Sequence, residues 1–192
     1  TSISKNATTG AITTQSSISS AGVSSFDANT MAVEAGTGIT GGTGTIYRSS
    51  VQRVGGIITT RILIDLTGLR STASGDIIGV NGASNVCHIG QITAARNGTI
   101  LTGSMECFEA PAGGDPDINV HSATEGTGVE DGAISDLTET LLVNAGDATL
   151  GSKVYFTAVP AADEFLYLTL GDTTDADYTA GKLFIELMGY EA

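Results

Sequence analysis

The sequence predicts an all-β protein, an antiparallel β-sandwich or jelly roll of about eight or nine strands preceded by an extended N-terminal arm. Three observations predict it. Short apolar runs recur from residue 46 onward, and Gly, Asn, Asp and Pro mark the gaps between them. No long segment keeps the 3.6-residue apolar period of a helix. The N-terminal quarter of the chain has a different composition from the rest and needs a separate account.

The arm, residues 1–45, is expected to be extended and to become ordered by lying on another surface. Ser, Thr and Gly make up 25 of its 45 residues, and few of its side chains are charged. Such a stretch cannot bury enough apolar surface to fold alone, yet it carries too little charge for a well-solvated linker. A free low-complexity tail is the alternative. If the arm is ordered, its isolated apolar side chains are candidate partner contacts, namely Ile3, Ile12, Ile18 and Phe26.

The body, residues 46–192, begins where this composition ends. Its clearest strand is 57–66, whose even positions are more apolar than the odd ones, as in a strand with one buried face. Residues 134–143 have a second interpretation, a helix with Asp136 as its N-cap, although a strand is favoured. The remaining predicted strands are 76–80, 86–93, 99–109, 118–122, 137–143, 153–159, 165–170 and 182–188.

One hairpin can be predicted with its register. Asn97-Gly98 is a strong turn signal between two β-runs. A three-residue loop there places Cys87 opposite Cys107, which gives one consistent apolar face. The two cysteines are therefore expected to be cross-strand neighbours. A disulfide between them stays open, and two buried free thiols are favoured.

Charge is distributed unevenly over a chain with a formal net charge of −13. Residues 106–192 hold most of the acidic side chains, whereas five of the six basic residues before them are arginines. Arg48 and Arg53 are therefore candidate partner contacts, and the acidic loops are expected to face solvent, where salt screens them. The shortage of basic residues argues against nucleic acid as a partner. No apolar run is long enough to span a membrane.

Residue types that carry catalysis or hold cofactors are scarce. Two His and two Cys leave little for a metal centre built from those ligands, so no enzyme activity and no cofactor are predicted. The Gly36-x-Gly38-x-x-Gly41 motif has neither the preceding strand nor the following helix of a dinucleotide site. A calcium ion is considered only at Asp172, Asp175 and Asp177. That loop lacks the bidentate Glu and central Gly of an EF-hand, so solvated turn carboxylates are favoured.

Several segments resemble proteins of tailed phages of marine bacteria. They are IITTRILIDLTGL at 57–69, DIIGVNG at 76–82, HIGQITAARNGTI at 88–100, ISDLTETLLVNAGD at 134–147 and KVYFTAVPAADEFLYLTLGDTTDADYTAGKLFIELMGYE at 153–191. The chain looks like a capsid decoration protein, also called a cement or head-stabilisation protein. The resemblance implies a β-sandwich or jelly-roll body on the outer capsid surface of the virion, assembled in the host cytoplasm. It also implies homotrimers that clamp neighbouring major capsid proteins.

Two further classes compete with that expectation. A pilus- or filament-like subunit would use the arm as a donor strand for the next copy. A receptor- or glycan-binding module of a phage fibre is the third class, and the absence of Trp counts against it.

Overall fold

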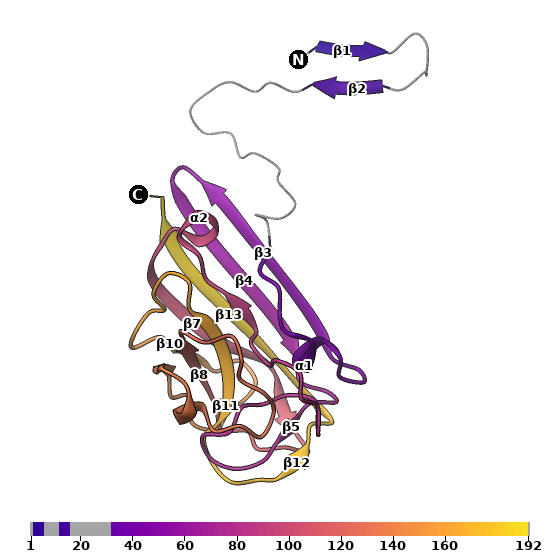
Figure 1. Cartoon of the computed structure of the whole chain (residues 1–192), viewed down its shortest axis with the longest axis vertical. Coiled ribbons are helices and arrows are strands. Elements are labelled where there is room, and N and C mark those ends of the chain that lie inside the picture. The colour runs from indigo at the N-terminus through magenta and orange to yellow at the C-terminus, as the bar shows by residue number, and fades with distance from the viewer. Residues whose placement is uncertain (1, 6–11, 16–31, 192) are drawn as a thin grey trace.

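The computed structural model describes residues 2–5, 12–15 and 32–191, and in this part of the chain it is an antiparallel β-sandwich (Figure 1). The nine strands of its two main sheets confirm the predicted fold class. The larger sheet has the strand order β10 (Lys153–Tyr155), β7 (Thr99–Ala112), β13 (Ala180–Tyr190), β4 (Ile57–Asp65) and β3 (Ile46–Val54). The smaller sheet has the order β6 (Gly90–Gln91), β11 (Phe165–Leu170), β8 (Ile118–Ala123) and β9 (Glu139–Val143).

Shorter elements complete the described chain. Two pairs of short strands form separate two-stranded sheets, and three single turns are helical. The strand pairs are β1 (Ser2–Lys5) with β2 (Ile12–Gln15) and β5 (Arg70–Ser71) with β12 (Ala176–Asp177). The turns are α1 (Thr37–Thr40), α2 (Ala94–Asn97) and the 3-10 turn η2 (Ile134–Asp136).

The alternation read from residues 57–66 is confirmed. In β4 the side chains at 58, 60, 62 and 64 are buried, while their neighbours up to position 63 are exposed or half-buried. Strand β13 pairs with β4 over nine residues and alternates in the same way. The larger sheet therefore has one buried and one open face, as antiparallel sheets commonly do. The long strands β3, β4 and β13 run side by side in Figure 1.

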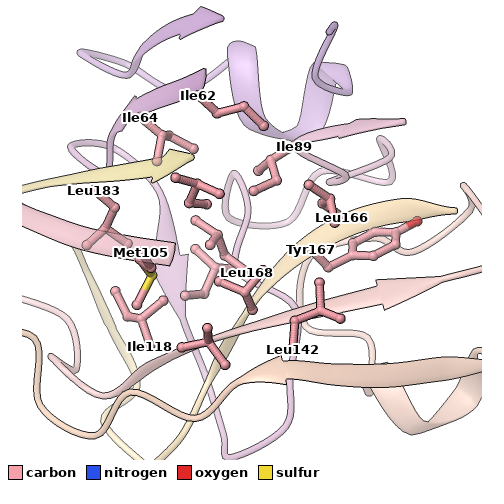
Figure 2. Close-up of a cluster of buried hydrophobic side chains, with 14 of the residues drawn as sticks. Ile62, Ile64, Ile89, Met105, Ile118, Leu142, Leu166, Tyr167, Leu168 and Leu183 are labelled. Atoms are coloured by element: carbon pink, nitrogen blue, oxygen red, sulfur yellow. The ribbon is translucent and has the colours of Figure 1, made fainter. Parts of the chain in front are cut away.

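The core lies between the two sheets. Ile62 and Ile64 of β4, Met105 of β7 and Leu183 of β13 contribute from the larger sheet, all at most 4% exposed. Figure 2 shows them facing a second group of side chains, which belongs mostly to the smaller sheet. That group comprises Ile89, Ile118, Leu142, Leu166 and Leu168.

The predicted hairpin at Asn97-Gly98 is wrong. Thr93 caps α2 by accepting a hydrogen bond from the Arg96 backbone, so Asn97 ends a helical turn. The Asn97 side chain is fully buried, since Oδ1 accepts from the Thr93 N–H and Nδ2 donates to Thr60 Oγ1 at 2.7 Å. Gly98 supplies the positive φ of 69° that ends the turn. The Asn-Gly signal therefore correctly predicted a turn at residues 97–98, but the segments on its two sides do not pair as a hairpin.

The cysteines are consequently not partners. Strand β7 pairs with β10 and β13, which places Cys107 opposite Leu183. Cys87 instead donates its backbone N–H to the Gly128 carbonyl. Both cysteines are buried and free.

Two other segments differ in part from expectation. Residues 76–80 and most of 86–93 are joined to their neighbours by single bridges, with only Gly90–Gln91 forming a regular strand. Residues 134–143 divide into η2 and β9, so the favoured strand is confirmed for its second half.

Residues 32–45, which the sequence placed in the arm, pack against the body. Val33 and Ile39 are at most 1% exposed and belong to the core. The Tyr47 hydroxyl lies 2.7 Å from the Ile89 carbonyl oxygen and 3.1 Å from that of Val33, so its one proton is shared between them and joins the β3 edge to the smaller sheet. Burying two such side chains contributes about 1.5–3 kcal/mol each. Ile3 and Ile12 lie in β1 and β2, whereas Ile18 and Phe26 lie outside the described residues.

The same segment explains the glycine motif at 36–41. The N–H groups of Gly36 and Gly38 donate to the carbonyls of His88 and Val86. A Cβ at Gly38 would lie 2.4 Å from the Cys87 Sγ atom, so only glycine permits this approach. The motif therefore serves close backbone packing.

Candidate docking surface

The face of the larger sheet that points away from the core is the candidate site, and it is called the outer face below. It consists of the alternate residues of β3, β4, β13, β7 and β10 that do not enter the core. Its apolar and aromatic members are Ile46, Val54, Ile57, Leu63, Phe108, Tyr155, Phe184, Met188 and Tyr190. Its charged members are Arg48, Arg61, Asp65, Glu106, Glu109, Lys153, Lys182 and Glu186.

Large apolar side chains on this face remain in solvent. Tyr155 is 67% exposed, Phe108 is 48% exposed and Met188 is 41% exposed. Phe108 stacks on Phe184 from the neighbouring strand, with ring centroids 5.1 Å apart and planes 9° apart. The Lys153 ammonium lies 5.9 Å from the centre of the Tyr155 ring. Aromatic side chains of this kind are enriched at protein interfaces.

The charges of the outer face other than Arg48 are paired within it. Arg61 and Glu186 lie 2.8 Å apart, and Lys153 and Glu106 lie 3.4 Å apart. Lys182 contacts both Asp65, at 3.3 Å, and Glu109. Pairing of this kind adds little stability at an exposed surface, but it lowers the desolvation penalty if a partner later covers the face.

Asp65 is held charged although it is nearly buried. Burial opposes its charge, but hydrogen bonds from the side chain and backbone of Thr67, together with the Lys182 ammonium, hold the pKa of this carboxyl below its ordinary value. The Glu109 carboxylate, followed by Asp65, raises the pKa of Lys182. The pairing therefore persists across the physiological pH range.

The outer face has no net charge, in contrast to the whole chain. Among the described residues it carries four basic and four acidic side chains, whereas the chain has a net charge of −13. The surplus of carboxylates lies elsewhere, largely in the loops of residues 110–177. One copy of this chain can thus present a neutral, partly aromatic surface to a partner.

The two arginines predicted as partner contacts have different surroundings. Arg48 lies on the outer face, and its exposed guanidinium makes one long hydrogen bond to the carbonyl of its neighbour Tyr47. Arg53 points the other way and binds the carbonyls of Ala95 and Arg96 and the Glu191 carboxylate. Arg48 fits a partner contact, whereas Arg53 holds α2 and the C-terminal strand against β3.

The three candidate calcium ligands are not gathered around a common point. Arg70 lies 2.6 Å from Asp175 and 2.9 Å from Asp177, so its guanidinium occupies both carboxylates. Within residues 32–191 and the two short N-terminal strands, no group of three metal-ligating side chains is present. Nor does any described helix have the length and apolar character to cross a membrane.

The acidic loops are not uniformly solvent-facing. Asp115 is 4% exposed and accepts hydrogen bonds from the backbone N–H groups of Asp117 and Thr174. Asp117 has one carboxylate oxygen that is buried without a hydrogen-bond partner. Burial, followed by the charges of Asp115, Asp147 and Asp172, raises the pKa of Asp117. Some of these carboxylates therefore hold the loops in place through hydrogen bonds, while others face water.

Sequence reasoning missed the outer face. Its signal is present in residues 182–190, where Phe184, Met188 and Tyr190 occupy the positions that alternate with the buried Leu183, Ile185 and Leu187. A strand that is apolar on both faces is typical of one covered on both sides.

Comparisons with protein-family models, curated proteins and solved structures find no match to this chain.

Proposed function

We propose that this chain is a structural protein of a phage head, which binds the outside of an icosahedral shell and stabilises it by clamping neighbouring major capsid proteins. The outer face carries the proposal, because it is partly aromatic, has no net charge and is uncovered by any described residue. The likeness of five sequence segments to capsid decoration proteins supplies the identity of the partner.

Physical reasons favour docking through this face. Phe108, Tyr155 and Met188 leave apolar surface in water on this face, and exposed apolar side chains gathered on one face commonly mark a binding surface. Many copies that carry −13 each repel one another on a crowded shell, and the repulsion is smallest when the acidic loops stay in solvent. Docking through those loops instead would desolvate carboxylates without partners, which costs roughly several kcal/mol per ion. The neutral face avoids this penalty.

The arm adds a second attachment. A trimer at a threefold or quasi-threefold position of the shell would present three outer faces and three arms, and its attachment would be multivalent. Ile3, Ile12, Ile18 and Phe26 are the proposed arm contacts, and Arg48 is the proposed contact of the body. In this arrangement the chain acts by binding and needs neither an active site nor a cofactor.

Co-sedimentation with shells that lack this protein tests the proposal. Phe184→Glu places an unpaired charge in the docked face and is expected to weaken binding about 100-fold or more, which corresponds to several kcal/mol. Leu150→Glu is the matched control, because Leu150 is 74% exposed and lies outside the outer face. The proposal fails if the two variants bind equally well while both remain folded.

The arginine contact has its own test. Arg48→Glu is expected to weaken attachment more than neutralisation of Asp172 and Asp175 together. Raising the salt concentration should loosen the wild-type complex only modestly, because most charges of the face are already paired within it. A larger effect of the aspartates would mean that the loops, and not the outer face, meet the shell.

One observation favours a filament-like subunit as a second candidate. Strand β3 is the edge of the larger sheet, so one side of its nine-residue backbone can accept a strand from another chain. Sedimentation of the purified protein distinguishes the two candidates, since head-to-tail strand donation gives open fibres and a clamp gives closed oligomers.

A further inference from the structure

The chain contains two Asn-Gly pairs in opposite environments. Asn81-Gly82 lies at the centre of a turn that the Ala83 N–H closes by donating to the Val80 carbonyl, and both residues are exposed. Asn97-Gly98 ends α2, with the Asn97 side chain fully buried and hydrogen-bonded at both ends. The same dipeptide therefore has one reactive and one protected setting.

The reactive setting has the parts that cyclisation of asparagine requires. A Cβ at Gly82 would meet nothing within 4 Å, so no neighbouring group hinders a ring at this position. The Gly82 N–H donates to Glu130 Oε2 at 3.0 Å, which polarises this N–H toward proton loss. Burial raises the pKa of Glu130 although the hydrogen bond from the Gly82 N–H opposes this shift, so its carboxylate is a better base than an ordinary one.

The protected setting lacks each of these parts. The Gly98 N–H is bound to the Ala94 carbonyl at 3.0 Å, and a Cβ at Gly98 would lie 2.3 Å from the Tyr190 carbonyl oxygen. The carboxamide of Asn97 cannot approach this nitrogen without breaking its bonds to Thr93 and Thr60. Reaction at Asn97 therefore requires local unfolding.

We propose that Asn81 is a site of spontaneous deamidation, with Glu130 as the base that accepts the Gly82 amide proton. The Gly82 nitrogen bonds to Asn81 Cγ, the bond from Cγ to Nδ2 breaks, and ammonia leaves with the transferred proton. Water then opens the cyclic imide at either carbonyl, which yields aspartate or isoaspartate. No oxidant or reductant takes part.

The product changes the charge of one surface groove. Asn81 lines this groove together with Arg70, Glu130, Asp131 and Asp175. Deamidation adds one more carboxylate to a site where three carboxylates already face one arginine. The modified protein is therefore more acidic by one charge at this end of the sandwich and unchanged on the outer face.

Peptide mapping of the intact folded protein after incubation at mildly alkaline pH tests the proposal. Trypsin separates the two pairs, because cleavage after Arg70, Arg96 and Lys153 gives the peptides 71–96 and 97–153. Fragment ions then locate the gain of one mass unit. Conversion at Asn81 is expected to be faster than at Asn97 by about tenfold or more, since only Asn97 needs local opening.

Two controls make the result decisive. In denaturant the two pairs should react at similar rates, because the difference is one of structure. Glu130→Gln, which keeps a hydrogen-bond acceptor but removes the base, should slow conversion at Asn81 in the folded protein and leave Asn97 unchanged. Equal rates in the folded protein, a difference that persists in denaturant, or a Glu130→Gln rate equal to wild type would each overturn the proposal.

Discussion

The two sheets of the sandwich are buried to different extents. In the smaller sheet, all six residues of β8 and five of the six residues of β11 are buried, including Tyr167 and Thr169, which point away from the larger sheet. In the larger sheet, β4 and β13 are buried on one face only. The smaller sheet is thus covered on both faces by its own chain, whereas one face of the larger sheet is left uncovered by the described residues.

The chain itself supplies the cover of the smaller sheet. The Tyr167 hydroxyl donates to the Glu125 carbonyl and accepts from the Gly128 N–H, and a Cβ at Gly128 would lie within 2.8 Å of the Tyr167 ring and the Ile77 side chain. The His88 ring packs 5.0 Å from the Phe165 ring on the same side. Segments around residues 77, 88 and 124–137 therefore form a third layer. No described segment does the same for the outer face.

The largest change in the free energy of unfolding is expected for the segment that joins the two sheets. Deleting residues 1–45 removes Val33 and Ile39 and should lower the free energy of unfolding by about 3–6 kcal/mol, at about 1.5–3 kcal/mol per side chain. Deleting residues 1–31 leaves these contacts intact and should change stability little. Urea unfolding of the two truncated chains measures the difference. Equal stabilities would mean that residues 32–45 are not part of the packed body.

A matched pair of leucines compares the core with the open side. Leu168→Ala in β11, at a fully buried position, should cost about 2–5 kcal/mol of stability. Leu101→Ala in β7, where the side chain is 54% exposed, should stay within about 0.5 kcal/mol of wild type. Thermal unfolding of both variants is the measurement. If the two variants lost similar stability, the Leu101 side chain would have to be buried in the free protein, contrary to this account.

A pH-dependent effect is expected at Asp117. Its pKa is raised in the folded protein, so the neutral form stabilises the fold and this stability is lost as the pH rises through the folded pKa. Asp117→Asn should therefore raise the melting temperature at neutral pH and leave it unchanged under acidic conditions, where the wild-type carboxyl is protonated. A variant that gains nothing at neutral pH would show that the unpaired oxygen carries no penalty.

The smallest effect on the fold is expected on the outer face itself. Replacing both members of the Arg61–Glu186 pair by Gln should change the free energy of unfolding by no more than about 1 kcal/mol, because exposed pairs are screened. Denaturant titration of the isolated variant checks this value. A loss of several kcal/mol would mean that the pair is needed for the sheet and is not a surface feature.

The sequence predicts the sheet elements better than it predicts their partners. Periodicity located β4, because a buried face repeats every second residue, and apolar runs between turn signals located β11 and β13. It could not show that β7 pairs with β10 and β13, since those pairings join residues far apart in the sequence. The sequence correctly marked a turn at Asn97. This turn ends the helical turn α2, which the Thr93 cap and the hydrogen bond from Asn97 to Thr60 stabilise, and does not connect two paired strands.

The candidate site was predictable only in part. Arg48 was identified from the charge distribution, and the structure places it on the outer face. Arg53 had the same signal, yet its guanidinium is used within the chain, where it contacts the Ala95 and Arg96 carbonyls and Glu191. Composition indicates which residue types are available for contacts, whereas only the fold determines which of them are already occupied.

Thiol labelling of the native assembly tests most directly whether the outer face is covered. The native thiols do not interfere, because burial raises the pKa of Cys87 to about 12 and also raises that of Cys107. Met188→Cys reports on the outer face, and Leu150→Cys reports on exposed surface elsewhere. Both thiols should react rapidly in the free protein. In the assembly, the thiol at 188 should be protected while the one at 150 stays reactive. Equal labelling of both positions in the assembly would contradict docking through the outer face.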